Sequence, residues 1–245
     1  MRNADRWVAS KFVLRNDTLA TSPDVTELAV GSRLVAGLVA KNYEQGIREY
    51  ARGRLLDVGC GKAPLYGFYR RFVDRTLTVD WPRSRHGNTY VDCACDLNHP
   101  LPFADGQFDT IVMSDVLEHV AEPLTLCSET SRILRPGGSL LLNVPFLYWL
   151  HERPHDYYRY TEYGLRHLLQ AGGLHIVVMK AIGGSPEVLA DLIAKHLAVA
   201  PLVGKAMAVA VQHAALCFVR VGIGRRASER SSALFPLGYF VVARK

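Results

Sequence analysis

The sequence lacks the features that mark several common classes of protein. No part of this 245-residue chain is an uninterrupted apolar run of about 20 residues, so no membrane-spanning helix is predicted. The N-terminus has no apolar stretch of signal-peptide type. The net charge is +6, but the basic residues form no long block, and no nucleic-acid partner is expected. These absences favour a cytoplasmic protein.

Cysteine is scarce and irregularly placed. The five cysteines, at positions 60, 93, 95, 127 and 217, include no pair with the spacing of a zinc site. An odd number of cysteines in a chain expected in the cytoplasm indicates free thiols. We therefore predict neither disulfide bonds nor a bound metal.

The most informative stretch is Leu55–Gly61, an apolar run that passes through an acid into a glycine turn. This pattern is typical of a buried parallel strand followed by a loop that approaches a ligand. A dinucleotide-binding turn needs a third glycine where this chain has Pro64. A phosphate-binding loop needs Ser or Thr after Lys62, and the chain has Ala63 there. A nucleoside ligand without a pyrophosphate remains.

Two acids further along the chain suit such a ligand. Asp80 ends the next predicted strand, and a carboxylate there can accept hydrogen bonds from both ribose hydroxyls. Asp96 precedes a turn and suits the exocyclic amine of adenine. The ring of Trp81 either stacks on adenine or caps the surface beside Pro82.

Several short motifs in a fixed order carry a resemblance to a known family. They are Leu56-Asp57-Val58-Gly59-Cys60-Gly61, Val79-Asp80, Asp96-Leu97, Leu101-Pro102-Phe103 with Phe108-Asp109, Asp115-Val116-Leu117-Glu118-His119, and Arg132-Ile133-Leu134-Arg135-Pro136-Gly137-Gly138. Over about residues 50 to 181 the chain thus resembles the class I S-adenosylmethionine (SAM)-dependent methyltransferases of the methyltransferase-11 type.

The resemblance implies an enzyme of EC class 2.1.1, with SAM as cofactor and a Rossmann-like sheet of seven strands. It also implies which residues bind the cofactor. These are Asp57, Gly59, Cys60, Gly61, Asp80, Trp81, Asp96, Leu97 and Ser114.

The order of the expected elements predicts an α/β fold with a doubly wound parallel sheet. Residues 1–52 form an N-terminal segment and a cap helix, which either closes over the cofactor or covers the sheet edge. Residues 53–185 form the SAM-binding core, with a first crossover helix over 65–73 and a short third strand over 90–92. Residues 186–232 form an apolar helical insertion, and 233–245 supply the final strand.

The loop 151–161, which is dense in His, Tyr, Arg and acids, follows the fifth strand and predicts an acceptor site. Imidazole titrates near neutrality, so His155 and His119 are the candidate bases, with Asp156 orienting an imidazole. The alternative is a solvated loop with a structural Arg–acid pair.

A metal-assisted variant of this site is a further alternative. In some ubiquinone-pathway and small-RNA 2′-O-methyltransferases, a similar group of acids and histidines holds a divalent metal. The corresponding residues here are Asp115, Glu118, His119 and His155. The Asp-Val-Leu-Glu-His run is also common in metal-free relatives, so no metal is predicted.

The insertion has few charged residues. Between Leu197 and Val219 only Lys205 is charged, and in a helix Lys205, Gln212, His213 and Arg220 would share one side. Through residues 186–224 the insertion could lie on the inner membrane surface, pack as an extra helical layer, or form a homodimer.

The sequence therefore predicts methyl transfer to a small-molecule, sugar or lipid-linked acceptor, at oxygen and with a His base. The alternatives are an N- or C-methyltransferase and a non-catalytic SAM-fold binding or scaffold protein. The expected partner is a small-molecule or glycan acceptor.

Overall fold

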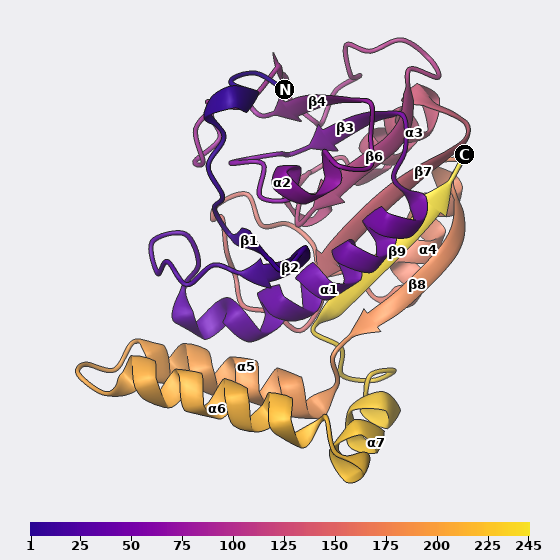
Figure 1. The fold of residues 1–245 in the computed structure, drawn as a ribbon. Helices are drawn as coiled ribbons and strands as arrows, with labels where there is room; N and C mark the ends of the chain where they lie inside the picture. Colours follow the sequence, from indigo (N-terminus) through magenta and orange to yellow (C-terminus); the bar gives the residue numbers. More distant parts are fainter.

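The centre of the molecule is a mixed sheet of seven strands in the order β5-β4-β3-β6-β7-β9-β8, in a computed structural model that describes residues 1–245 (Figure 1). The strands are β3 (Arg54–Val58), β4 (Arg75–Asp80), β5 (Cys93–Ala94), β6 (Phe108–Ser114), β7 (Leu134–Pro145), β8 (His175–Ile182) and β9 (Gly238–Arg244). Only β9 runs antiparallel to its neighbours, β7 and β8. The predicted seven-stranded, doubly wound sheet is confirmed.

Helices cover both faces of the sheet because adjacent strand residues point to opposite sides. On one face, Leu56 and its neighbours pack against α3 (Pro123–Ile133) and α4 (Glu162–Ala171). On the other face, Leu55 packs in a cluster with α1 (Arg33–Tyr50) and α2 (Tyr66–Tyr69). Thr161 caps α4 as expected, since its hydroxyl accepts a hydrogen bond from the Gly164 amide at 3.1 Å.

The helix α1 fits closely onto the sheet. The Tyr43 hydroxyl donates a hydrogen bond to the Met113 carbonyl at 2.9 Å, although both groups are buried. A Cβ on Gly46 would lie 2.6 Å from the Phe240 ring, so glycine allows the helix to approach β9. The cap helix expected from the sequence therefore covers the sheet face.

Two elements of the first half differ from the expectation. The crossover helix is only Tyr66–Tyr69, and the chain then turns through hydrogen bonds from the Arg71 and Phe72 amides to carbonyls three residues earlier. The third strand is Cys93–Ala94, not residues 90–92. The Asp92 amide donates to the Thr78 carbonyl, but the Thr78 amide donates to the carboxylate of Asp92 and not to a backbone carbonyl. Local turns and side-chain hydrogen bonds shortened both elements.

The first thirty residues are more ordered than their weak periodicity suggested. The strands β1 (Phe12–Arg15) and β2 (Thr18–Thr21) form a hairpin whose turn residues, Asn16 and Asp17, both have positive φ. This geometry is that of a two-residue hairpin loop, for which Asn and Asp are favoured. Short 3₁₀ turns at Ala4–Arg6 and Val30–Ser32 flank the hairpin.

The helical insertion lies beside the sheet domain (Figure 1). The helices α5 (Ser185–Ala198) and α6 (Gly204–Phe218) lie side by side as a hairpin, and α7 (Gly222–Ser231) follows at one end. Small side chains such as Ala194 and Ala208 pack against Val30, and Ala190 packs against Leu34. No single helix is long and apolar enough to cross a bilayer; α6 and α7 meet the length and composition only together, and the pair is bent by 96°.

The polar stripe expected along α6 does not form, because Gln212 points inward. Its amide oxygen accepts a hydrogen bond from the Leu34 amide at 2.6 Å, and its nitrogen donates to the Val30 carbonyl at 2.9 Å. Lys205 and His213 remain exposed on the outside of the helix. The side chain assigned to the polar face thus fixes α6 to the start of α1.

Candidate active site

A cavity of about 800 Å³ lies at the carboxyl ends of β3, β4 and β6. This is the edge at which open α/β sheets bind ligands, and the volume is within the range of small-molecule sites. The glycine turn, the start of α1, the loop after β7 and parts of the N-terminal segment form its walls. Every residue predicted to bind the cofactor lines this cavity, and so do His119 and His155, but Asp156 does not.

The turn after β3 presents bare backbone to the cavity. Gly59 and Gly61 have φ values of 63° and 51°, which L side chains rarely adopt. A Cβ on Gly59 would lie 2.5 Å from the Val116 side chain. The amides of Gly59 and Cys60 both donate to the Val79 carbonyl, at 2.8 and 3.2 Å, and this fixes the turn beside β4.

The carboxylate of Asp80 lies directly against this turn. One oxygen accepts a hydrogen bond from the Gly61 amide at 2.7 Å, and the other accepts one from the Trp81 amide at 2.6 Å. Burial raises the pKa of Asp80, while these two amides act in the opposite direction. Each oxygen keeps a second lone pair, so the group can still accept bonds from a ligand hydroxyl.

Asp96 lies on another wall of the same cavity. One of its oxygens accepts hydrogen bonds from the amide and the side chain of Asn98, at 2.9 and 2.7 Å. These bonds hold the pKa of Asp96 below its ordinary value, so the carboxylate is ionised at neutral pH. Asp80 and Asp96 thus line the same cavity as the glycine turn, and their role in binding a nucleoside stays a prediction.

Asp57 is buried beneath the turn and accepts a hydrogen bond from the Tyr69 hydroxyl at 2.8 Å. Burial raises its pKa from 3.8 to about 7. The native state therefore retains this proton at pH values where the unfolded chain has lost it. The retained proton contributes to the free energy of unfolding. That contribution is complete below the unfolded-state pKa of Asp57 and is lost as the pH rises through about 7.

The substitution Asp57→Asn should therefore stabilise the protein more at about pH 8 than at about pH 5. The amide oxygen of Asn can still accept from Tyr69 and carries no charge to desolvate. The difference between the two pH values should be about 2 to 3 kcal/mol of unfolding free energy, measured by denaturant titration. Asp74→Asn, at an exposed position, should show little change at either pH. Equal effects of Asp57→Asn at both pH values would contradict the account.

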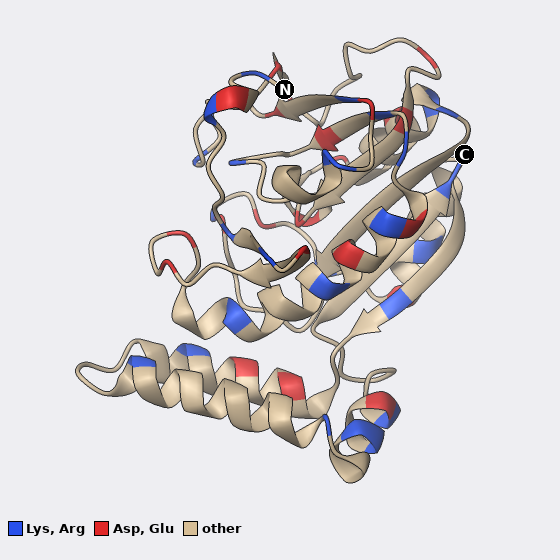
Figure 2. Ribbon diagram, viewed as in Figure 1, with Lys and Arg blue, Asp and Glu red and all other residues tan.

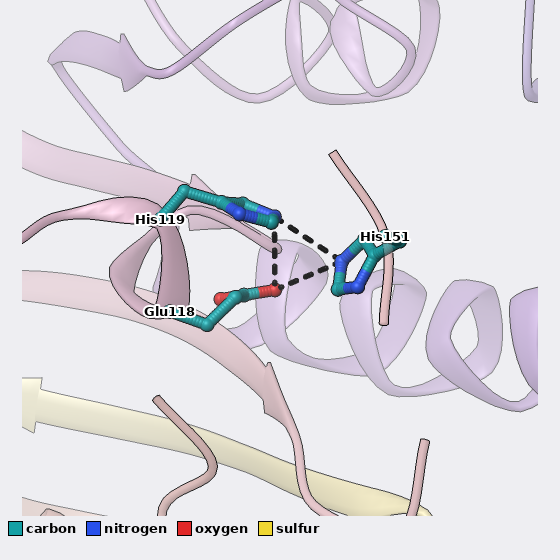
Figure 3. A group of neighbouring side chains, drawn as sticks. All are labelled: Glu118, His119 and His151. Carbon is teal, nitrogen blue, oxygen red and sulfur yellow. Dashed lines mark hydrogen bonds and ion pairs between the residues drawn. The ribbon is translucent and has the colours of Figure 1, made fainter. Parts of the chain in front are cut away.

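Three ionisable side chains converge beside the cavity, and two of them, His119 and His151, line it (Figure 3). Glu118 and His119 belong to the 3₁₀ turn Leu117–His119, and His151 comes from the loop after β7. The Glu118 Oε1 atom lies 3.7 Å from His119 Nε2 and 3.6 Å from His151 Nε2. Glu118 is fully buried, and neither of its carboxylate oxygens has a hydrogen-bond partner. The carboxylate thus faces two imidazole rings.

The hydrogen bonds of His119 define which of its ring nitrogens carries the hydrogen and which carries the lone pair. Its Nδ1 lies 2.6 Å from the His155 carbonyl, which can only accept, so Nδ1 carries a hydrogen. In the neutral ring Nε2 then has a lone pair, and this atom lies 3.1 Å from His151 Nε2. The arrangement makes His119 Nε2 the acceptor and His151 the donor.

The ring of His151 is positioned by an ion pair behind it. Asp156 accepts a hydrogen bond from the His151 amide at 2.9 Å and lies 3.4 Å from Nδ1. Arg159 donates to both oxygens of Asp156, at 2.6 and 2.7 Å. Burial would lower the pKa of His151, but Glu118 and then Asp156 raise it above the ordinary value. Asp156 thus contacts an imidazole, that of His151, and also forms an Arg–acid pair with Arg159. Its contacts fit both roles considered from the sequence.

The other two residues of the metal-assisted alternative, Asp115 and His155, do not join this cluster. The carboxylate of Asp115 binds Lys11 Nζ at 2.8 Å and accepts a hydrogen bond from Asn143. His155 is exposed, packs edge-on to Trp81 with ring centroids 5.1 Å apart, and lies 3.0 Å from the Tyr157 hydroxyl through Nδ1. Glu118, His119 and His151 have ligand atoms within 4.8 Å of one another and form a set that could hold a divalent cation.

The N-terminal segment contributes residues that sequence reasoning missed. Lys11 reaches across the cavity to Asp115, and Glu27 pairs with Lys62 of the glycine turn at 2.7 Å. Burial would lower the pKa of Lys11, but Asp115 raises it. No periodicity or spacing in the sequence indicates Lys11. His151 lay within the loop already predicted as the acceptor site, and its direct link to Asp156 became visible only in three dimensions.

Comparison with known proteins defines the class. Residues 56–142 match a family model described as a methyltransferase domain. An uncharacterised methyltransferase of Mycobacterium sp. (strain KMS) is 34% identical over 124 residues, which are 47% of this chain and 47% of that protein. The ubiquinone biosynthesis O-methyltransferase of Ruegeria pomeroyi is 28% identical over 165 residues, covering 57% of this chain and 66% of that protein.

Solved structures of methyltransferases have a similar fold. A SAM-dependent methyltransferase from Archaeoglobus fulgidus has a TM-score of 0.55 at 16% identity, covering 85% of this chain and 93% of that one. Residues 56–142 are thus similar to a methyltransferase domain, and the chain has the fold of the SAM-dependent methyltransferases. Its match to the mycobacterial relative spans about half of that protein's length.

Proposed function

We propose that the chain transfers the methyl group of SAM to a hydroxyl oxygen of a small-molecule, sugar or lipid-linked acceptor. The observation that carries this proposal is the unprotonated Nε2 of His119, in the cavity that also contains the glycine turn and Asp80. Its lone pair accepts from His151 in this structure, and an acceptor hydroxyl would take the place of that donor. A hydroxyl must lose its proton during transfer and needs a base, whereas a neutral amine does not. The similarity to a ubiquinone biosynthesis O-methyltransferase also favours oxygen.

In the proposed reaction an acceptor oxygen attacks the sulfonium methyl carbon in line with the C–S bond. A C–O bond forms, the C–S bond breaks, and its electron pair returns to sulfur to give S-adenosylhomocysteine (SAH). The hydroxyl proton moves to His119 Nε2. The carboxylate of Glu118 stabilises the resulting imidazolium, and the carbonyl of His155 keeps the ring oriented.

His155 has a different proposed role, although it stays a second candidate for the base. Its ring packs on Trp81, which the sequence assigns to the adenine end of the cofactor. Its Nδ1 is occupied by the Tyr157 hydroxyl, so only Nε2 is free. We propose that His155 and Trp81 together cover the nucleoside.

The buried carboxylate of Glu118 supports a metal-assisted version of the same reaction. An unpartnered carboxylate beside two imidazoles is the ligand set of several catalytic divalent-metal sites. Such an ion would be held by Glu118, His119 and His151, and when bound it would lower the pKa of the acceptor hydroxyl. The acceptor and the reaction would be unchanged.

The proposal is tested with SAM that carries a ¹³C-labelled methyl group and a panel of hydroxyl, amine and carbon acceptors. We expect labelled product only with hydroxyl compounds, identified by the carbon chemical shift of a methyl on oxygen. Parallel reactions with EDTA separate the metal-free from the metal-assisted version. Methyl shifts of N- or C-methyl products would overturn the assignment to oxygen. A chain that binds no SAM would fit only the non-catalytic scaffold alternative.

A further inference from the structure

The insertion carries an exposed apolar surface that the sheet domain leaves uncovered. On α5 three exposed side chains lie at positions i, i+3 and i+4, which places them on one face. The hairpin tip and the outer side of α6 continue with further exposed apolar side chains. We call these six residues the insertion surface: Leu189, Leu192, Ile193, Leu202, Met207 and Phe218. Monomeric proteins seldom expose so many large apolar side chains together.

The exposed charges around this surface are mostly positive. No Asp or Glu occurs between Asp191 and Glu229, and Asp191 itself is buried against Lys195. The exposed charged residues in that interval are Lys205, Arg220, Arg225 and Arg226. Figure 2 shows blue segments at the hairpin tip and on α7, few charges along α6, and red segments on α5 and α7. The acids of α5, Glu187 and Asp191, are buried, whereas Glu229 of α7 is exposed. The surface is therefore apolar with a cationic border.

The insertion is joined to the wall of the cavity. The Lys195 ammonium of α5 lies 4.1 Å from the ring centroid of Tyr148, which lines the cavity, and 5.5 Å from that of Trp149. Trp149 and Leu150, the next residues of the loop after β7, are 51% and 67% exposed. The insertion is thus in contact with the loop that holds His151, and this loop also exposes large apolar side chains.

We propose that the insertion surface docks onto an anionic phospholipid bilayer. Apolar side chains can enter the boundary between headgroups and acyl chains while the bordering cations meet anionic lipids. A second copy of this chain is a poorer partner, because a symmetric pair would bring the same cations together. This position would place the cavity near lipid, and, if the proposed methyl transfer holds, it would favour a lipid-linked acceptor.

Vesicle sedimentation tests the docking without any measurement of activity. The full chain should bind vesicles of phosphatidylcholine mixed with phosphatidylglycerol, should bind pure phosphatidylcholine much less, and should dissociate as salt increases. The double substitution Met207→Glu and Phe218→Glu should weaken binding at least tenfold, roughly the loss expected for two buried apolar side chains. Leu124→Glu is the matched control, because Leu124 on α3 has the same 47% exposure as Met207.

The same measurements have results that would exclude docking to a bilayer. No binding to anionic vesicles, or equal weakening by Leu124→Glu, would overturn the docking proposal. A dimer in sedimentation velocity that Met207→Glu dissociates, without vesicle binding, would assign the surface to a second copy. Methyl transfer to a soluble acceptor is measured separately, so failure of either proposal leaves the other to its own test.

Discussion

Asp80→Ala is expected to weaken binding of SAH roughly 100- to 1000-fold. The carboxylate is fixed against the glycine turn by the amides of Gly61 and Trp81, and it is the group predicted to accept both ribose hydroxyls. Each hydrogen bond to a charged group is worth about 1.5–3 kcal/mol, and each 1.4 kcal/mol is about tenfold in affinity. Isothermal titration calorimetry measures the change directly.

Two further variants separate ligand binding from folding of the turn. Asp80→Asn keeps one acceptor oxygen and the side-chain shape, so its loss of affinity should be intermediate. Asp92→Asn is the matched control, because Asp92 accepts from the Thr78 amide at 2.9 Å and does not line the cavity. Wild-type affinity for SAH in a folded Asp80→Ala variant would contradict the predicted role of this carboxylate.

His119→Gln is expected to lower turnover about 10²- to 10⁴-fold, the usual contribution of a general base. Gln retains a polar side chain of similar reach but cannot take up the hydroxyl proton. Because His119 is not among the residues predicted to hold adenosine, the dissociation constant for SAH should change less than about threefold. Single-turnover rates with labelled SAM, together with calorimetry, give the two quantities.

The control for this substitution is His167→Gln, at an exposed position on α4 outside the cavity. His151→Gln should lower turnover as well, since His151 lies 3.1 Å from His119 and completes the cluster. If His119→Gln turned over normally and His155→Gln did not, the base would be His155. That result would leave methyl transfer intact and reassign one residue.

Much of the fold was predictable because its signals are local. The run from Leu55 to Gly61 encodes a strand and a turn within seven residues, and the positive φ of both glycines follows from the tight turn they form. Asp80 and Asp96 could be placed at the same cavity because parallel strands end at one edge of a sheet. Pro123 at the first position of α3 and the Thr161 cap of α4 follow from similarly local chemistry.

The rest of the candidate site depends on contacts between distant segments. Lys11 meets Asp115 across more than a hundred residues, and no spacing rule predicts such a pair. Within the loop 151–161, the sequence indicated that Asp156 could orient an imidazole but not which one, and in the structure the ring beside it is that of His151. From the sequence, Gln212 was expected on the exposed polar side of α6. A helical wheel does not show that the start of α1 packs against that side of α6.

A crystal structure of the chain with SAH would test the central claim most directly. The account predicts the nucleoside in the 800 Å³ cavity, with the ribose hydroxyls on Asp80, the sugar against the Gly59–Gly61 backbone, and the sulfur facing His119. SAH bound elsewhere on the molecule, or bound in the cavity with Asp80 out of contact with the ribose, would contradict it.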